Sequence, residues 1–336
     1  MGKMISFTLW VTTSCNMECS YCYEGVKKSN TNMTLETGMA AAHWMVGTMR
    51  NGGYTFAQIR FHGGEPTINM PVIRGVVDSL REIGKELKFE FSLTSNGYQV
   101  ARDDLDYLLA NMDELSISLD GTKEINDICR KNKYNEGVFD KVFAVCKYLV
   151  EQKENIWIRM TINDVNCAFL SDSIKFFLEN GMRHIAAVPD LFCVNWTSEH
   201  VDTIEYQCRT LRDYIKEEEV DAEIILPLTE KVFNHIPCGA GKEKYEIDVQ
   251  GKIYPCSYVI TSDMCMGDIY NGLNRNVVKN IKEICLQSVT KCVGCNGYNS
   301  CISTRCKFIN KAVTGDYFLP VPLVCELHRR EAKKLF

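Results

Sequence analysis

The chain has 336 residues, of which 46% are hydrophobic and 24% are charged, and its formal net charge is −5 at pH 7. This composition is typical of globular proteins and excludes a disordered chain, a coiled coil and a collagen-like fibre. The slight negative charge argues against nucleic-acid binding, which needs a basic surface. No apolar run is long enough to span a membrane, so we expect neither nucleic acid nor membrane as a partner.

Strand-like and helix-like segments alternate through the first two-thirds of the chain. Apolar, β-branched runs predict strands at residues 5–12, 58–62, 88–94, 114–119, 156–162 and 184–188. Helical periodicity predicts helices at residues 34–49, 72–85, 103–112, 138–153 and 171–180. This alternation indicates an α/β fold with right-handed βαβ units and a parallel sheet. A partial (β/α)6 barrel and a doubly wound sheet both fit, and both place functional residues at the carboxyl ends of the strands.

The character of the chain changes in its last third. Residues 198–219 are predicted to form one charged helix, and alternation at 245–249 and 252–254 around Gln250-Gly251 predicts a β-hairpin. We therefore expect a domain at residues 1–195, a bridging helical region at 196–236, and a small cysteine-rich α+β domain with a β-hairpin at 237–336.

Seventeen cysteines are the unusual feature of the composition. The odd count means that internal disulfides cannot pair all of them. No secretory signal peptide is recognisable, and cytoplasmic proteins keep their thiols reduced. We therefore expect a cytoplasmic protein in which many cysteines bind metal.

Three of the cysteines follow the first predicted strand directly, in the spacing Cys15-x3-Cys19-x2-Cys22. Three thiolates this close can hold three corners of an iron–sulfur cube and leave one iron open for a cofactor or substrate. A zinc site is the alternative, but it would need a fourth ligand, and the nearest histidine, His43, lies within a helical pattern.

With Tyr21 before the last cysteine, this motif resembles the signature of the radical S-adenosylmethionine (radical SAM) enzymes. The resemblance implies a partial (β/α)6, TIM-like barrel with a 4Fe–4S cluster on Cys15, Cys19 and Cys22. In that family, the open iron binds the amino and carboxylate groups of SAM. Reductive cleavage of SAM then yields a 5′-deoxyadenosyl radical, which abstracts a hydrogen atom from the substrate.

Further motifs follow successive predicted strands, at the edge where a βα sheet builds its active site. Each of them alone could be a capped turn, but their order along the strands favours a shared site. The resemblance implies that the following residues contact SAM: Tyr21, Gly63, Gly64, Glu65, Pro66, Ser95, Asn96, Ser118, Arg130 and Leu191.

A second group of cysteines lies near the C-terminus, as Cys292-x2-Cys295-x5-Cys301-x4-Cys306 followed by Cys325, with Cys238 and Cys256 upstream. A zinc ribbon would use four of them, whereas two iron–sulfur clusters account for all seven. The layout resembles the SPASM extension of radical SAM enzymes, although the fourth spacing is four residues instead of three. The resemblance implies an outer cluster on Cys292, Cys295, Cys301 and Cys325, an inner cluster on Cys238, Cys256 and Cys306, and thus three 4Fe–4S clusters in all.

The fourth ligand of the inner cluster is an open question in the sequence. Lys244 stands where some relatives have a further cysteine, and lysine does not bind such clusters. We expect an open iron there, able to bind a substrate thiolate, with Cys265 as the alternative ligand. The other cysteines are expected to be mostly small buried side chains: Cys129, Cys146, Cys167, Cys193, Cys208 and Cys285.

The resemblance to peptide maturases implies hydrogen-atom abstraction from a ribosomally made, Cys-containing peptide and an oxidative crosslink such as a thioether. Sulfatase-maturing relatives, which oxidise Cys or Ser to formylglycine, carry an aspartate after the cysteine that matches Cys256. The corresponding residue here is Ser257, a poor base, so sulfatase maturation is the second hypothesis. Candidate bases are Asp248, Asp263 and His235. A zinc-holding binding module is the non-enzymatic alternative.

Expected partners follow from the same resemblance. They are the peptide or protein substrate and an electron donor such as flavodoxin or ferredoxin. Because Cys15 leaves little chain before it for a recognition domain, we also expect that a leader peptide binds the barrel, the bridging helix or a separate protein. Exposed clusters react with oxygen, so an anaerobic setting is expected.

Overall fold

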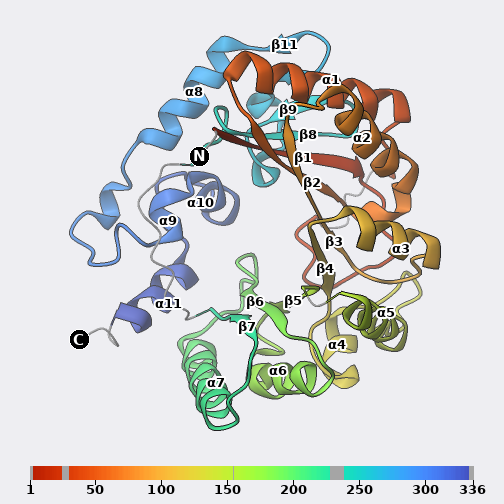
Figure 1. Ribbon diagram of the computed structural model, residues 1–336. Helices are drawn as coiled ribbons and strands as arrows, with labels where there is room; N and C mark the ends of the chain where they lie inside the picture. The colour runs from red at the N-terminus through yellow and green to blue at the C-terminus, as the bar shows by residue number, and fades with distance from the viewer. Residues whose placement is uncertain (1–2, 25–29, 154, 228–237, 333–336) are drawn as a thin grey trace.

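The computed structural model describes residues 3–24, 30–153, 155–227 and 238–332. In this part of the chain the strands form one 11-stranded sheet, in the order β11-β10-β9-β8-β1-β2-β3-β4-β5-β6-β7, which curves into an open arc (Figure 1). Seven neighbouring strands run parallel: β1 Met4–Thr12, β2 Phe56–Gly63, β3 Lys88–Ser95, β4 Glu114–Ser118, β5 Trp157–Ile162, β6 His184–Pro189 and β7 Glu223–Ile225. The six strands predicted from the sequence are confirmed. Of these seven, the short edge strand β7 was not predicted.

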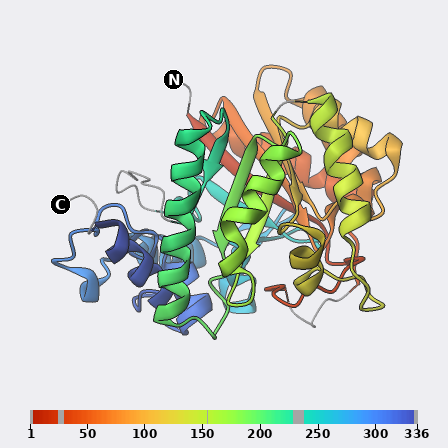
Figure 2. The same ribbon diagram turned by 90° about the horizontal axis from the view of Figure 1, so that it is seen from below.

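Helices cover the outer, convex side of this arc, as Figures 1 and 2 show. They are α1 Leu35–Gly52, α2 Met70–Ile83, α3 Arg102–Asn111, α4 Lys123–Cys129, α5 Phe139–Gln152, α6 Leu170–Glu179 and α7 Ser198–Glu217, with short 3-10 turns η1 Pro66–Asn69 and η2 Cys167–Phe169. The predicted helices are confirmed to within a few residues. The seven-residue helix α4 was not predicted, because so short a segment shows no clear periodicity.

The core lies between the sheet and these helices. From Phe7 onward, all six remaining residues of β1 are buried, because helices cover one face of a parallel strand and the barrel interior covers the other. Helix α1 packs on the sheet through a stripe that includes Ala41, Ala42 and Met45, each of them fully buried. Thr34 caps the start of α1, and Gly53, in the left-handed conformation with φ 65°, ends it.

The predicted hairpin is confirmed as β8 Lys244–Ile247 and β9 Lys252–Tyr254, which pair antiparallel. Strand β8 also pairs in parallel with Ser6–Leu9 of β1, so the hairpin extends the barrel sheet directly. The rest of this region contains β10 Gly267–Asp268, β11 Gly272–Leu273, η3 Ser257–Val259, η4 Ser262–Met264, α8 Arg275–Leu286, η5 Thr290–Cys292, α9 Ile302–Arg305, α10 Lys307–Thr314 and α11 Pro322–Ala332. Helices α9 to α11 face the concave side of the arc (Figure 1).

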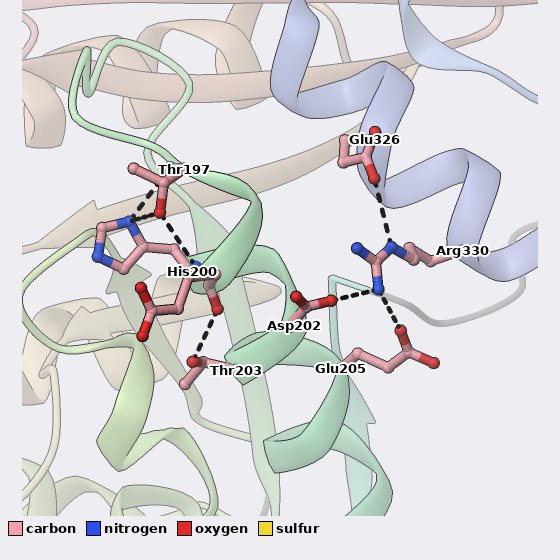
Figure 3. A network of polar contacts seen from close by, with 8 residues as sticks. Thr197, His200, Asp202, Thr203, Glu205, Glu326 and Arg330 are labelled. Carbon is pink, nitrogen blue, oxygen red and sulfur yellow. Dashed lines mark hydrogen bonds and ion pairs between the residues drawn. The ribbon is translucent and has the colours of Figure 1, made fainter.

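Polar contacts join the C-terminal helix α11 to α7 (Figure 3). Helix α7 begins with a capping box in which Thr197 and His200 bond to each other's backbone N–H groups. Arg330 on α11 pairs with Asp202 and Glu205 on α7, and with Glu326 one turn before it. Since α11 also carries a cysteine of the C-terminal group, these ion pairs help to place that cysteine against the barrel.

Among the described residues, no helix is both long enough and apolar enough to cross a membrane.

Candidate active site

The three-cysteine motif forms a loop at the carboxyl end of β1. The Sγ of Cys15 accepts hydrogen bonds from the backbone N–H of Met17 at 3.4 Å and from Nδ2 of Asn96 at 3.6 Å. Burial raises the pKa of Cys19. Arg130 opposes this shift, and the nearby Cys15 and Cys22 add to it. The three thiols therefore share one site, in which a bound metal cluster would favour their thiolate forms.

The end of β2 packs tightly against the start of this cysteine loop. A Cβ on Gly63 would lie 2.2 Å from the carbonyl oxygen of Thr12, and one on Gly64 would lie 2.4 Å from that of Ser14. Gly63 also has φ 153°, a conformation that other residues rarely adopt. Both glycines are thus required by the approach of two backbone segments of the protein itself.

Glu65, the next residue, ties together the segments that follow the first three strands. Its carboxylate is buried and accepts hydrogen bonds from the side chain of Ser95 at 2.9 Å and the backbone N–H of Asn96 at 2.6 Å. It also accepts two from Thr67, and its own N–H donates to the carbonyl oxygen of Ser14 at 2.8 Å. Glu65 therefore sets the position of the cysteine loop relative to β3.

A buried network fixes Tyr21 of the motif. Its hydroxyl donates to Oδ2 of Asp120 at 2.6 Å and accepts from Nη1 of Arg130 at 2.6 Å. The other oxygen of Asp120 accepts from the backbone N–H of Thr161 at 2.9 Å. Asp120 is fully buried and Arg130 nearly so, and their opposite charges stabilise one another in this setting.

These segments surround a cavity of about 330 Å³ at the carboxyl edge of the sheet. The cavity is lined by the three motif cysteines and by nine of the ten residues predicted to contact SAM: Tyr21, Gly63, Gly64, Glu65, Ser95, Asn96, Ser118, Arg130 and Leu191. Pro66, the tenth, is buried at the start of η1 and does not line it. A larger hollow of about 550 Å³ opens at Gly84, Asp113 and Lys153, beside the amino ends of β3 to β5, and no cysteine lines it.

The donor set of the smaller cavity fits an iron–sulfur cluster and SAM. Three thiols are available as cluster ligands, in a loop that other strand ends hold in place. Nε of Arg130 is buried and has no hydrogen-bond partner among the described residues. A buried guanidinium with a vacant N–H is suited to a carboxylate, which is the acidic group of SAM.

Two of the predicted bases, Asp248 and Asp263, do not line this cavity. Asp248 caps the hairpin turn by accepting from the backbone N–H groups of Gln250 and Lys252, and Asp263 is exposed on η4. His235 lies outside the described residues. Asp190, directly after β6, does line the cavity, and burial raises the pKa of its carboxyl group.

Sequence reasoning passed over two of these acids. Asp190 is the first residue after β6, and Asp120 is the second residue after β4. Both therefore lie at the edge of the sheet where functional residues were expected. That position was the available signal. Asp120 acts through its contacts with other side chains, and this role is not visible in a sequence.

The C-terminal cysteines gather in two sets. Burial raises the pKa of Cys325, and Cys301, Cys292 and Cys295, which lie nearby, raise it further. These four residues are the predicted outer set, and the structure brings them together.

The predicted inner set also comes together. Burial raises the pKa of Cys256, and its neighbours Cys306 and Cys238 have the same effect. None of the seventeen cysteines forms a disulfide in the described part of the chain. Over the same ranges, no three His, Cys, Asp or Glu side chains lie close enough to hold a single metal ion.

Ser257 follows Cys256, and its backbone N–H bonds to the carboxylate of Glu246 on β8. The same carboxylate accepts from the indole N–H of Trp10 at 3.2 Å. Burial raises the pKa of Glu246 to about 7. An acid thus lies beside the position where sulfatase-maturing relatives carry their aspartate, although Glu246 itself does not line the cavity.

Comparison with known proteins identifies the domain that carries the three-cysteine motif. Residues 11–165 match the model of the Radical SAM superfamily. A cysteine-type anaerobic sulfatase-maturating enzyme of Clostridium novyi (strain NT) is 24% identical over an alignment of 321 residues, and the match covers 87% of this chain and 85% of that protein.

Two solved structures share the fold over nearly the whole chain. Native anSMEcpe with bound AdoMet and Cp18Cys peptide has a TM-score of 0.81 at 17% identity and covers 98% of this chain and 96% of its own. Streptococcus suis SuiB bound to precursor peptide SuiA has a TM-score of 0.70 at 14% identity, with 97% and 76% covered. A non-enzymatic zinc module does not fit this domain match. The chain carries a radical SAM domain over residues 11–165 and is an enzyme of the radical SAM type.

Proposed function

We propose that this enzyme is a peptide maturase that closes a bond between a cysteine sulfur and a carbon atom of a ribosomally made peptide. One observation carries the proposal. The cavity is lined by the cysteine loop after β1 and also by Tyr258 and Ile309. Tyr258 is two residues from Cys256, and Ile309 is three residues from Cys306, so segments next to the inner C-terminal set share the cavity with the first cysteine set.

This placement suits an oxidation in which a substrate loses a hydrogen atom at one end of the cavity and an electron at the other. The cluster and SAM, when bound, supply a radical that removes a hydrogen atom from carbon. Forming the S–C bond also requires loss of the thiol proton and of one further electron. Cys238, Cys256 and Cys306 would hold an auxiliary cluster close enough to take that electron, and the outer set would pass it on.

The residues of this chain have separate tasks in the proposal. Arg130 and the segment that begins at Gly63 would orient SAM, and the network of Tyr21 and Asp120 would hold Arg130 in place. Asp190 is the carboxylate in the cavity best placed to take up the thiol proton, because it follows β6 directly and its raised pKa makes it a stronger base than an exposed aspartate.

Peptide substrates also occur in the solved structures of similar fold, which hold the Cp18Cys peptide and the precursor peptide SuiA. This supports a peptide or protein as the substrate here. We further propose three 4Fe–4S clusters, a flavodoxin or ferredoxin as electron donor, a separate leader-peptide-binding protein, and a cytoplasm poor in oxygen as the setting.

Oxidation of a protein Cys or Ser to formylglycine is the second candidate. The similarity to the sulfatase-maturating enzyme of C. novyi over most of its length favours it. Ser257 argues against it, since a hydroxyl is a poor base where those relatives carry an aspartate.

The test combines enzyme reconstituted with iron and sulfide under anaerobic conditions, SAM, dithionite and a Cys-containing peptide encoded beside the gene. We expect formation of 5′-deoxyadenosine together with loss of two hydrogen atoms from the peptide, and fragmentation that places a bridge between a cysteine and another residue. A product carrying an aldehyde would favour the second candidate. Cleavage of SAM with no change in any such peptide would refute the proposal.

A further inference from the structure

A fourth cysteine lies beside the inner set. Cys285 is in the last turn of α8 and is 5% exposed, and its thiol shares a hydrogen bond with that of Cys238. Its sulfur also lies close enough to Cys306 for their charges to interact. The inner set of Cys238, Cys256 and Cys306 thus becomes a group of four thiols.

The packing of α8 holds Cys285 in this place. Ile281, one turn before it on the same face, is buried against the loop that follows Cys238. A Cβ added to Gly241 in that loop would lie only 3.3 Å from the Ile281 side chain. Figure 1 shows α8 descending from the β11 edge of the sheet toward α9 and α10, between which Cys306 lies. The packing of α8 therefore places Cys285 near both the loop that follows Cys238 and the junction of α9 and α10.

The surroundings of the four sulfurs suit an anionic group. Lys307 is buried, and its ammonium interacts with the charges of Cys285, Cys306 and Cys238. The positive charge of Lys244 favours the thiolate forms of both Cys238 and Cys306. Four thiols without a disulfide, next to two lysines, match the ligand set of a 4Fe–4S cluster, which binds four thiolates and carries negative charge.

Cys265, the alternative considered from the sequence, is engaged elsewhere. Its thiol donates to the carbonyl oxygen of Gly267 in β10 at 3.4 Å, and it also shares a hydrogen bond with the side chain of Tyr254. Of the two candidates, only Cys285 contacts a member of the inner set in the described structure.

We propose that Cys285 is the fourth thiolate ligand of the inner auxiliary cluster. This rests on the auxiliary clusters of the proposed function and deepens it. A cluster with four protein ligands has no open iron, so it transfers electrons and does not bind the substrate thiol. That role differs from the open iron expected from the sequence, and it leaves activation of the thiol to a side chain in the cavity.

The test uses the full chain with Cys15, Cys19 and Cys22 all changed to Ala, so that only auxiliary clusters remain. Into this parent we introduce Cys285→Ser or, as the matched control, Cys265→Ser. Iron and sulfide are counted after anaerobic reconstitution, and electron paramagnetic resonance spectra are recorded before and after mild oxidation.

We expect the Cys285→Ser variant to lose one iron of the inner cluster on oxidation and to show the spectrum of a three-iron cluster. The Cys265→Ser variant should match the parent. An unchanged spectrum in Cys285→Ser, or the three-iron signal in Cys265→Ser, would overturn the proposal.

A second measurement does not depend on the folding of a Cys285 variant. Adding 2-mercaptoethanol to the reduced parent should leave its spectrum unaltered, because no iron is open to a new thiolate. A shift caused by the thiol would overturn the proposal. Neither readout uses a peptide. An enzyme that shows this pattern but forms no sulfur–carbon bond would therefore contradict the proposed function and leave the ligand assignment of Cys285 standing.

Discussion

The buried network around Tyr21 offers a quantitative test of how the site is held. Changing Asp120 to Asn keeps the shape of the side chain but removes the negative charge that faces Arg130 across the tyrosine hydroxyl. Hydrogen bonds to buried charged groups contribute about 1.5–3 kcal/mol each, and leaving one member of a buried ion pair alone costs about 3–5 kcal/mol. Because Tyr21 stands between the two charges, we expect the lower end of that range, about 3 kcal/mol.

The assay is urea unfolding of the reconstituted enzyme under anaerobic conditions, followed by tryptophan fluorescence. Tyr21→Phe removes the bridging hydroxyl and leaves both charges, so it should cost less, about 1–2 kcal/mol. Asp172→Asn, at an exposed position in the first turn of α6, should change stability by no more than about 0.5 kcal/mol. The reasoning fails if Asp120→Asn is no more destabilising than Asp172→Asn.

Three further predictions follow from the site. The Gly64→Ala variant should lose iron from the first cluster, since its Cβ would meet the Ser14 carbonyl oxygen at 2.4 Å; Gly47→Ala, whose Cβ has no atom within 4 Å, should keep the iron content of the wild type. Burial raises the pKa of Glu246 from 4.5 to about 7, so the folded state holds this proton more tightly than the unfolded chain. The contribution of Glu246 to the unfolding free energy should then fall as the pH rises from about 4.5 to about 7, by up to about 3 kcal/mol; a Glu246→Gln variant with the same pH profile as the wild type would contradict this. Finally, Cys19→Ala should abolish 5′-deoxyadenosine formation, whereas Cys325→Ala should retain it and lose the peptide product; chromatography of the nucleoside and mass spectrometry of the peptide measure both, and residual cleavage by Cys19→Ala would argue against the cluster assignment.

The barrel part was accessible from the sequence because its signals are local. A parallel strand that is covered on both faces has a nearly continuous apolar sequence, as at residues 5–12. The helices between the strands show a clear helical period of apolar residues. The cysteine spacing of residues 15–22 likewise carries its chemistry within eight positions. By contrast, α8 was missed, although Asn274 caps it and Ile281 and Cys285 share its buried face, because loops and glycines surround so short a pattern.

Contacts between distant segments could not be predicted in this way. The parallel sheet, the cysteine loop at its edge and the cysteine-rich C-terminal region could be predicted, since each depends on residues that are neighbours in the sequence. Three contacts became visible only in the folded chain: β8 pairs with β1, Arg130 bonds to Tyr21 across 109 positions, and Cys285 contacts Cys238. Such meetings depend on how helices and strands pack after they form, and burial rather than spacing brings these side chains together.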